Sequence, residues 1–88
     1  MDDLGPPASY LVLEKGAHVY GSDGEKVGRV AEVRADLEKD IFDGLVIERS
    51  ILPGGEHYVT ADRVDEIYEG GVVLALDSTA VESLPAPD

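Results

Sequence analysis

The sequence contains no cysteine. This absence excludes disulfide bonds, thiolate metal sites and cysteine nucleophiles together. No apolar run approaches the roughly 18 residues that a membrane-spanning helix needs, and no basic segment is followed by an apolar stretch. We therefore expect neither a transmembrane helix nor a secretory signal in these 88 residues, and the simplest expectation is a cytoplasmic location.

Basic residues are scarce, since seven Lys and Arg oppose nineteen Asp and Glu and give a formal net charge of -12. A surface with this charge repels phosphate groups, so we expect no direct nucleic-acid binding and no membrane insertion. Three explanations of the charge stay open: solubility, a basic protein partner, or adaptation to a salty cytoplasm. The lysines are few (Lys15, Lys26 and Lys39), which agrees with the last explanation without establishing it.

The chain also lacks a sustained helical periodicity, because no eleven-residue stretch repeats apolar positions at i, i+3, i+4 and i+7. Short runs rich in β-branched and aromatic residues recur instead and predict strands. These runs are residues 10–13, 17–20, 27–34, 42–48, 57–60 and 72–76, with a further strand expected near 66–69. The predicted fold class is all-β.

Glycine-containing turns separate the predicted strands. Asp23-Gly24 and Gly70-Gly71 suit two-residue type I′ turns, and Pro53-Gly54 suits a type II turn. Three such tips predict a meandering antiparallel sheet, and closure into a small barrel is the natural way to remove its edges. Gly28 offers a β-bulge that would bend the strand at 27–34 around a barrel corner.

Two segments depart from the strand pattern. In residues 60–67 we expect one capped helical turn before the strand at 66–69. Near the end of the chain, Thr79 and Glu82 match a capping box, and Pro85 limits that helix to one or two turns.

The ends of the chain have no periodicity. Residues 1–8 and 85–88 are therefore predicted to be flexible tails. The single folded domain is expected to span residues 9–84.

Acidic glycine-containing loops raise the question of metal binding. The segment GSDGEKVGRV, residues 21–30, does not fit a calcium-binding EF-hand loop, because the fifth position counted from Asp23 is Val27. A hairpin tip explains the segment, and we expect Asp23→Asn to be close to neutral. Residues 36–43 gather four acids. A cation- or ligand-responsive stress or regulatory protein using this loop is our alternative function.

No reactive constellation stands out. A Ser50–His57–Asp62 set can be written, yet no nucleophile elbow or oxyanion-hole motif accompanies it, and we expect His18 and His57 to lie at the surface. The sequence has no phosphate-binding loop, dinucleotide fingerprint or zinc-ligand spacing. We predict that the protein is not an enzyme and has no catalytic residues, no cofactor and no metal, with catalysis through His57 as a third hypothesis.

Four segments in order resemble the PRC-barrel domain: GAHVYGSDGEKVGRVAEV, FDGLVIER, YVTADRVDEIYEGGVVLAL and VESLP. The matching features are a V-x-x-x-D-G-x-x-V-G-x-V hairpin (residues 19–30), a V-x-x-x-x-V-x-x-I segment (59–67) and a glycine-turn strand (71–76), and the likeness covers about residues 10–84. The resemblance implies a six-stranded antiparallel β-barrel used as a docking module, without catalytic residues. Within that family the chain is similar to the stand-alone members. It is less similar to the reaction-centre H subunit or the ribosome maturation factor, because it has no transmembrane helix and no second barrel.

We therefore expect a non-enzymatic protein–protein interaction or adaptor module that forms a homodimer and binds an unidentified protein. The dimer is expected because apolar residues occupy both faces of the same strands, whereas a barrel interior takes only one face. The residues assigned to the outer face are Val46, Ile51, Leu52, Val73 and Ala75. A two-fold interface would pair this patch with itself, although residues 10–13 and 80–84 could cover part of it from within the chain.

Overall fold

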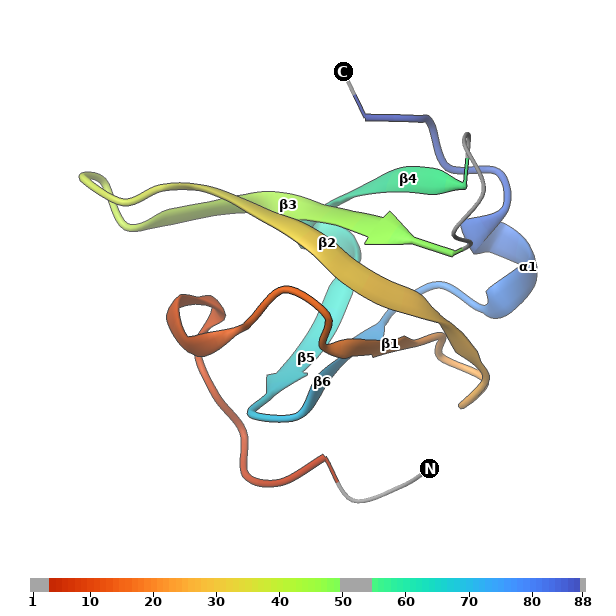
Figure 1. Cartoon of the computed structure of the whole chain (residues 1–88), viewed down its shortest axis with the longest axis horizontal. Helices are drawn as coiled ribbons and strands as arrows, with labels where there is room; N and C mark the ends of the chain where they lie inside the picture. Colours follow the sequence, from red (N-terminus) through yellow and green to blue (C-terminus); the bar gives the residue numbers. More distant parts are fainter. Residues whose placement is uncertain (1–3, 50–54, 88) are drawn as a thin grey trace.

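The structure is a computed structural model that describes residues 4–49 and 55–87. Within these residues the chain forms six strands, two 3-10 turns and one short α-helix (Figure 1). In chain order they are η1 (Tyr10–Val12), β1 (His18–Tyr20), β2 (Lys26–Asp36), β3 (Ile41–Glu48), β4 (Glu56–Thr60), η2 (Ala61–Arg63), β5 (Val64–Tyr68), β6 (Gly71–Leu74) and α1 (Ser78–Val81). The mostly-β class is confirmed, and so are the short helical turns after residue 60 and after residue 77. Among these elements, no helix has the length and apolar character that crossing a membrane requires.

All six strands belong to one mixed sheet in the order β4-β3-β2-β1-β6-β5. Neighbouring strands are antiparallel except β1 and β6, which run parallel with His18 opposite Gly71 and Tyr20 opposite Val73. The prediction of a purely antiparallel sheet is therefore wrong at this pair. Turn residues predict hairpins between strands adjacent in sequence, whereas β1 and β6 are joined through four intervening strands.

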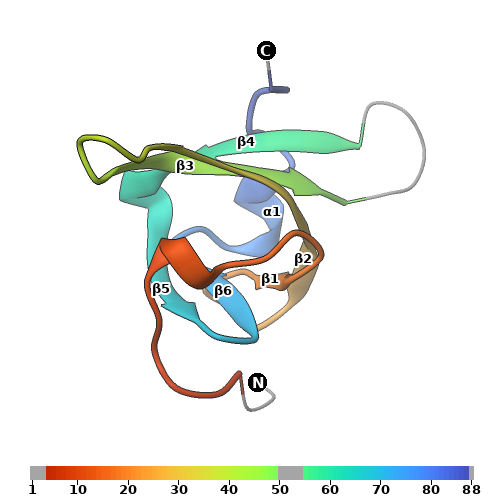
Figure 2. The same cartoon turned by 60° about the vertical axis from the view of Figure 1, so that its left-hand side comes forward.

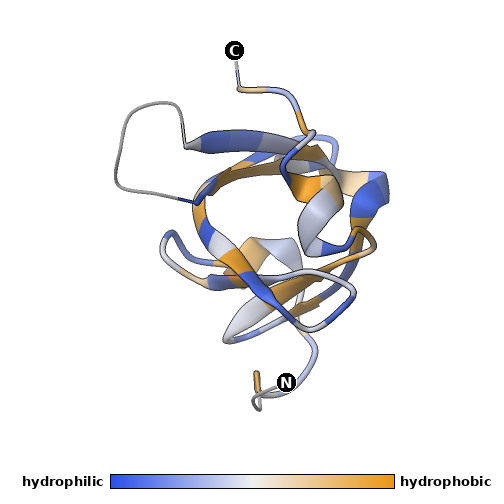
Figure 3. Ribbon diagram, turned by 90° about the vertical axis from the view of Figure 1, so that its right-hand side faces the viewer, coloured by the Kyte–Doolittle hydropathy of each residue, from blue (hydrophilic) through white to orange (hydrophobic). Residues whose placement is uncertain are grey.

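The sheet curls around the core without closing into a barrel. The bent strand β2 connects two halves, so that β3 and β4 lie on one side of the core and β1, β6 and β5 on the other (Figures 1 and 3). In the described part of the chain, the edge strands β4 and β5 do not pair with each other. Closure of the predicted barrel is thus not confirmed.

Terminal segments cover both edges of this open sheet. Residues 4–8 run beside β5, where the amide of Ala8 donates to the carbonyl of Ile67 at 2.9 Å. At the opposite edge the amide of Tyr58 in β4 donates to the carbonyl of Pro85 at 2.8 Å. Such contacts occupy backbone groups that would otherwise be a template for another strand. Hydrogen bonds do not measure mobility. The flexibility predicted for residues 1–8 and 85–88, and the domain bounds at residues 9 and 84, therefore stay predictions.

Two register shifts explain why β2 departs from strict alternation. Its pairing with β1 skips Val27, and its pairing with β3 skips Ala31. Each bulge adds one residue to β2 and bends the strand. As a result Val27, Val30 and Val33 all pack on the core although they are spaced by three residues. The bulge that was predicted at Gly28 is found at Val27, one residue earlier. The second bulge, at Ala31, was not predicted.

Residues 10–12 form the turn η1, so the strand predicted at residues 10–13 is wrong. The hydroxyl of Ser9 accepts a hydrogen bond from the amide of Leu11 at 2.9 Å and so caps the turn. A local side-chain acceptor of this kind gives the backbone an alternative to strand pairing. The turn delivers Leu13 into the core.

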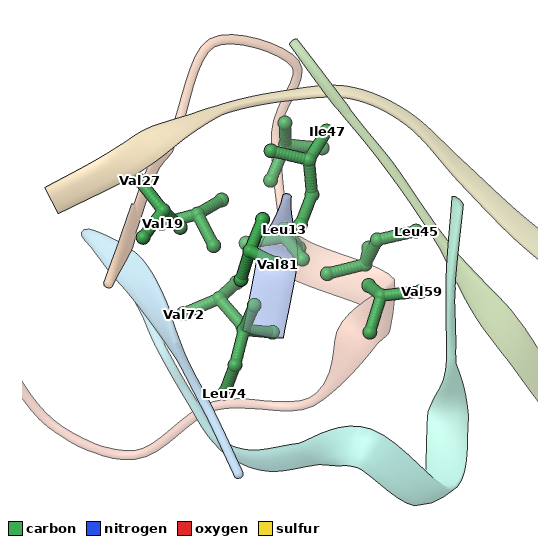
Figure 4. Packing of buried hydrophobic residues seen from close by; sticks show 10 residues of the cluster. Leu13, Val19, Val27, Leu45, Ile47, Val59, Val72, Leu74 and Val81 are labelled. Atoms are coloured by element: carbon green, nitrogen blue, oxygen red, sulfur yellow. The ribbon is translucent and has the colours of Figure 1, made fainter. Parts of the chain in front are cut away.

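Within residues 4–49 and 55–87 the core cluster contains ten buried apolar side chains: Leu13, Val19, Val27, Val30, Leu45, Ile47, Val59, Val72, Leu74 and Val81. They come from both halves of the sheet, from Leu13 directly after η1, and from α1, whose Val81 points in among them (Figure 4). Helix α1 starts after Asp77, whose carboxylate accepts a hydrogen bond from the amide of Ala80 at 2.8 Å. The capping box predicted at Thr79 therefore begins two residues too late.

The turn between β1 and β2 is longer than the predicted two-residue loop. The amide of Gly24 donates to the carbonyl of Gly21 at 3.0 Å, and the amide of Gly21 donates to the carbonyl of Glu25 at 2.8 Å. A type I′ turn needs positive φ at both central residues, whereas here Gly24 has φ of 83° and Asp23 is not in the left-handed region. The prediction of a turn at this place is confirmed, and its type is corrected.

We expect Gly24→Val to destabilise the protein by about 1–2 kcal/mol, because a β-branched residue resists positive φ. Crowding does not contribute, since a Cβ atom at Gly24 would meet nothing within 4 Å. Urea unfolding followed by circular dichroism measures the difference. A neutral effect would contradict the assignment of φ at this glycine.

Candidate functional site

Four large apolar side chains are strongly exposed in the described residues, and they belong to two neighbouring segments. Leu11 and Val12 in η1 are 61% and 55% exposed, whereas Leu37 and Ile41 beside the β2–β3 turn are 72% and 48% exposed. The free end of the β2–β3 hairpin extends past η1 (Figures 1 and 2). Clustered apolar exposure of this kind marks an interaction surface more often than single exposed residues do.

A groove of about 290 Å³ lies between η1 and this hairpin. Its lining, which defines the η1 groove, consists of Tyr10, Leu11, Leu13, Val33, Ala35 and Leu37. Leu13 is buried in the core and Val33 packs against it, while Leu11 and Leu37 are open to solvent. The groove therefore has a floor fixed by the core and an apolar rim that another molecule can reach.

Tyr10 holds η1 against the hairpin. Its ring stacks on Phe42 with centroids 5.1 Å apart and planes inclined by 11°, and its hydroxyl donates to Asp40 Oδ1 at 2.6 Å. That hydrogen bond, with desolvation and the negative charges of Asp40 and Asp36, raises the pKa of Tyr10 to about 12. Tyr10 thus connects the two walls of the groove, and the carboxylates of Asp36 and Asp40 lie near this contact.

Carboxylates outnumber cations in the two segments that form the groove. Within residues 10–15 and 33–42 the charged residues are Glu14, Asp36, Glu38 and Asp40, against Lys15, Arg34 and Lys39. Arg34 is paired with Glu32. Neither lysine forms an ion pair within residues 4–49 and 55–87. The apolar rim is consequently flanked by a net negative charge.

The acidic loop 36–43 does not arrange its carboxylates as a cation site. Asp36 Oδ1 accepts a hydrogen bond from the amide of Lys39 at 3.3 Å, and Asp40 accepts the hydroxyl of Tyr10. No group of three or more Asp, Glu or His side chains is placed to hold a metal in the part of the chain that the structure describes. The geometry gives no support to the alternative function that relies on this loop.

The residues predicted to form a dimer interface lie in different surroundings. Val46 is 1% exposed, Val73 is half-buried and Ala75 is exposed. Ile51 and Leu52 lie outside the described residues. The strongly exposed apolar side chains are therefore found elsewhere, with Leu11 and Leu37 lining the η1 groove, while the predicted interface itself stays a prediction.

Val46 shows how an outward-facing apolar residue becomes buried without a partner chain. It faces Glu32 on β2 and Tyr58 on β4 across the sheet. The guanidinium of Arg34 lies over the Tyr58 ring, 5.3 Å from its centroid, and pairs with Glu32 at 3.4 Å. Long side chains of the neighbouring strands thus surround Val46 and shelter it from solvent.

Both histidines are half-buried, and His18 stacks on Tyr20 with ring centroids 6.4 Å apart. His57 Nδ1 lies 2.9 Å from the carbonyl oxygen of Leu84, beside the edge of β4. Asp62 contacts the hydroxyl of Thr60 and, at 3.8 Å, Arg63, while Ser50 lies outside the described residues. These contacts do not assemble the nucleophilic set considered above, and the expectation of a non-enzymatic protein stays a prediction.

Asp23 links the β1–β2 turn to helix α1. Its carboxylate accepts hydrogen bonds from the hydroxyl of Ser78 at 2.8 Å, from the Ser78 amide at 3.2 Å and from the Glu25 amide at 3.2 Å. These bonds, the Ser78 hydroxyl first, lower the pKa of Asp23. Asp23 is thus a structural carboxylate, and the expectation that Asp23→Asn is neutral no longer holds, because an amide offers only one acceptor oxygen.

We expect Asp23→Asn to lower the thermal unfolding midpoint at pH 7, with a smaller difference from wild type at low pH. The folded-state pKa lies below the ordinary value of 3.8, so the contribution of the carboxylate is present above that value and is lost as the pH falls through the folded-state pKa. Circular dichroism melts at pH 7, 5 and 3 measure this trend. The control is Glu25→Gln, whose carboxyl is exposed in the same turn. An equal difference at all three pH values would contradict the role of the charge.

Residues 13–82 match the model of a family described as "Uncharacterized protein conserved in bacteria (DUF2171)". The chain belongs to this family. The assignment to the PRC-barrel family is therefore wrong. Its motifs record turns and apolar positions, which many small β-folds share. A search of curated proteins gave no match.

The DUF2171 segment begins inside the η1 groove. Leu13 and the whole β2–β3 hairpin belong to the segment, and its last residue is Glu82, just after the core residue Val81. Residues 10–12, which form η1, precede it. One wall of the groove is therefore part of the DUF2171 match, and the other wall is contributed by the residues before it.

Sequence reasoning missed the groove for two identifiable reasons. Residues 10–13 were predicted to be a strand, whereas Leu11 and Val12 lie in the turn η1, where both are strongly exposed. Leu37 did carry a signal, because it is an apolar residue inside the acidic tip DLEKD, where no strand pattern requires one.

Proposed function

We propose that this protein is a non-enzymatic protein–protein interaction module that docks a partner at the η1 groove. The observation that carries the proposal is the gathering of strongly exposed apolar side chains on the two walls of one groove. In a chain with 30% charged residues, such a patch costs solubility. Burial of the patch against a docked partner would explain why these apolar residues are exposed in the isolated chain.

The contacts that join the two walls of the groove also support docking. Tyr10 stacks on Phe42 and bonds to Asp40, and Leu13 is anchored in the core. A surface held in place before binding loses less conformational entropy on association. Residues on the rim can then contribute affinity without first having to order the loop.

Affinity capture from cells that contain this protein tests the proposal. The bait is the wild type, the double variant Leu11→Ser/Leu37→Ser, or the double variant Val73→Thr/Ala75→Ser on the surface predicted from the sequence. We expect a protein recovered with the wild type and the second variant but lost with the first. Loss of that protein only with Val73→Thr/Ala75→Ser would place docking on the other surface and contradict the proposal.

Self-association is a separate prediction. We expect a two-fold homodimer that tightens as salt rises, because a net charge of -12 on each chain opposes association at low ionic strength. Sedimentation equilibrium at low and high salt measures it. A monomer under both conditions at about 100 µM protein would contradict the dimer.

A further inference from the structure

We propose that the η1 groove takes a basic segment of another protein, one that presents apolar side chains between lysines or arginines. This inference rests on the proposed function and adds the chemistry of the partner. It follows from two features of the same surface, the apolar rim and the carboxylates beside it.

The apolar part of the segment follows from the lining. Leu11 in η1 and Leu37 in the hairpin turn both line the groove, while Leu13 and Val33 connect it to the core. A groove of about 290 Å³ is small. It suits a few side chains of a peptide segment and not the broad face of a folded domain.

The basic part of the segment follows from charge complementarity. Glu14 and Glu38 are exposed, and neither forms an ion pair within the described residues. Asp40 accepts the hydroxyl of the groove residue Tyr10 at 2.6 Å, so a carboxylate lies directly at the wall of the groove. Cationic side chains on both sides of an apolar anchor would meet these carboxylates and speed association.

The same charges disfavour other occupants. A second copy of the chain would bring another net charge of -12 toward the groove, and like charges across an interface cost free energy. Phosphate backbones and anionic lipid surfaces are repelled for the same reason. A cationic protein segment is the class of partner to which both features of the groove are complementary.

Peptide selection tests the inference without a known partner. A random library of about 12-residue peptides is selected on the wild type at low salt, where charge effects are largest. Binders to Leu11→Ser/Leu37→Ser are removed by counter-selection. We expect the surviving peptides to be enriched in Lys and Arg together with Leu, Ile, Met or Phe. Survivors without basic residues, or no survivors that depend on the groove, would overturn the inference.

A charge-matched pair of variants locates the effect. Glu14→Gln/Glu38→Gln beside the groove and Glu48→Gln/Glu56→Gln on β3 and β4 each remove two negative charges from exposed positions. For a selected peptide measured by calorimetric titration, we expect binding to weaken about three- to tenfold in the first variant. The second variant should bind like the wild type. Equal weakening in both would mean that net charge, and not the groove, attracts the peptide.

The outcomes separate this inference from the proposed function. If capture from cells depends on Leu11 and Leu37 but the selected peptides are neutral or acidic, the partner chemistry is wrong and docking at the groove stands. If capture does not depend on these residues, the proposed function itself fails. If Leu11→Ser/Leu37→Ser abolishes a wild-type dimer in sedimentation, the groove serves a second copy, which overturns the inference.

Discussion

Gly44→Ala is expected to destabilise the protein by about 3 kcal/mol, at the upper end of what overpacking costs. A Cβ atom at Gly44 would collide with the carbonyl oxygen of Val59 on the paired strand and would lie 2.7 Å from the hydroxyl of Tyr58. The carbonyl belongs to the β3–β4 backbone pairing and cannot move away as a flexible side chain can. For a domain of this size the thermal midpoint should fall by roughly 12–24 °C, as measured by circular dichroism.

The matched control makes the same chemical change at Gly24, where φ is 83° but nothing lies within 4 Å of the added atom. Gly24→Ala should cost only about 1–2 kcal/mol of backbone strain. Adding Tyr58→Ala to Gly44→Ala should restore little stability, because the backbone carbonyl stays in place. A larger loss for Gly24→Ala than for Gly44→Ala would contradict the close approach of β3 and β4.

Val81→Asp is expected to leave the protein largely unfolded at 25 °C. Val81 is fully buried and lies in the middle of the core (Figure 4). A carboxyl group there would have no polar partner, and we expect a cost of about 5 kcal/mol or more. The free energy of unfolding of a small domain lies at the lower end of the usual range, at about 5 kcal/mol, so this loss removes essentially all of it. Far-UV circular dichroism of the purified variant checks the result.

Thr79→Asp is the control for the added charge, because Thr79 lies in the same helix and is exposed. A carboxylate near a helix N-terminus is favourable, so this variant should stay within about 0.5 kcal/mol of the wild type. Equal stability of Val81→Asp and Thr79→Asp would mean that α1 does not pack into the core.

Local patterns predict those parts of the fold that depend on neighbouring residues. The turn at Asp23-Gly24, the turn η2 and helix α1 follow from turn residues and short local patterns, although η2 has no side-chain cap and α1 is capped by Asp77. The parallel pairing of β1 with β6 does not follow, because no local residue specifies contacts between strands joined through the rest of the sheet. Segment 10–13 fits a strand pattern as well as a turn, and the hydroxyl of Ser9 decides between them.

Sequence reasoning reached the class of function proposed here but not its surface. The alternation of side chains along β3 indicates that Val46 faces away from the core cluster. Alternation cannot show that long side chains of the neighbouring strands cover Val46. Exposure at Leu11 and Leu37 depends on how η1 meets the hairpin, which is a tertiary contact through Tyr10 and Phe42. Such a groove becomes visible only when segments distant in sequence are placed together.

Site-specific photo-crosslinking in living cells tests the docking surface most directly. A photoreactive benzoylphenylalanine replaces Leu37, which is 72% exposed at the groove, or Glu56, which is exposed on β4. We predict a crosslinked adduct with another protein from position 37 and none from position 56. The absence of an adduct at position 37, or the same adduct at both positions, would contradict docking at the η1 groove.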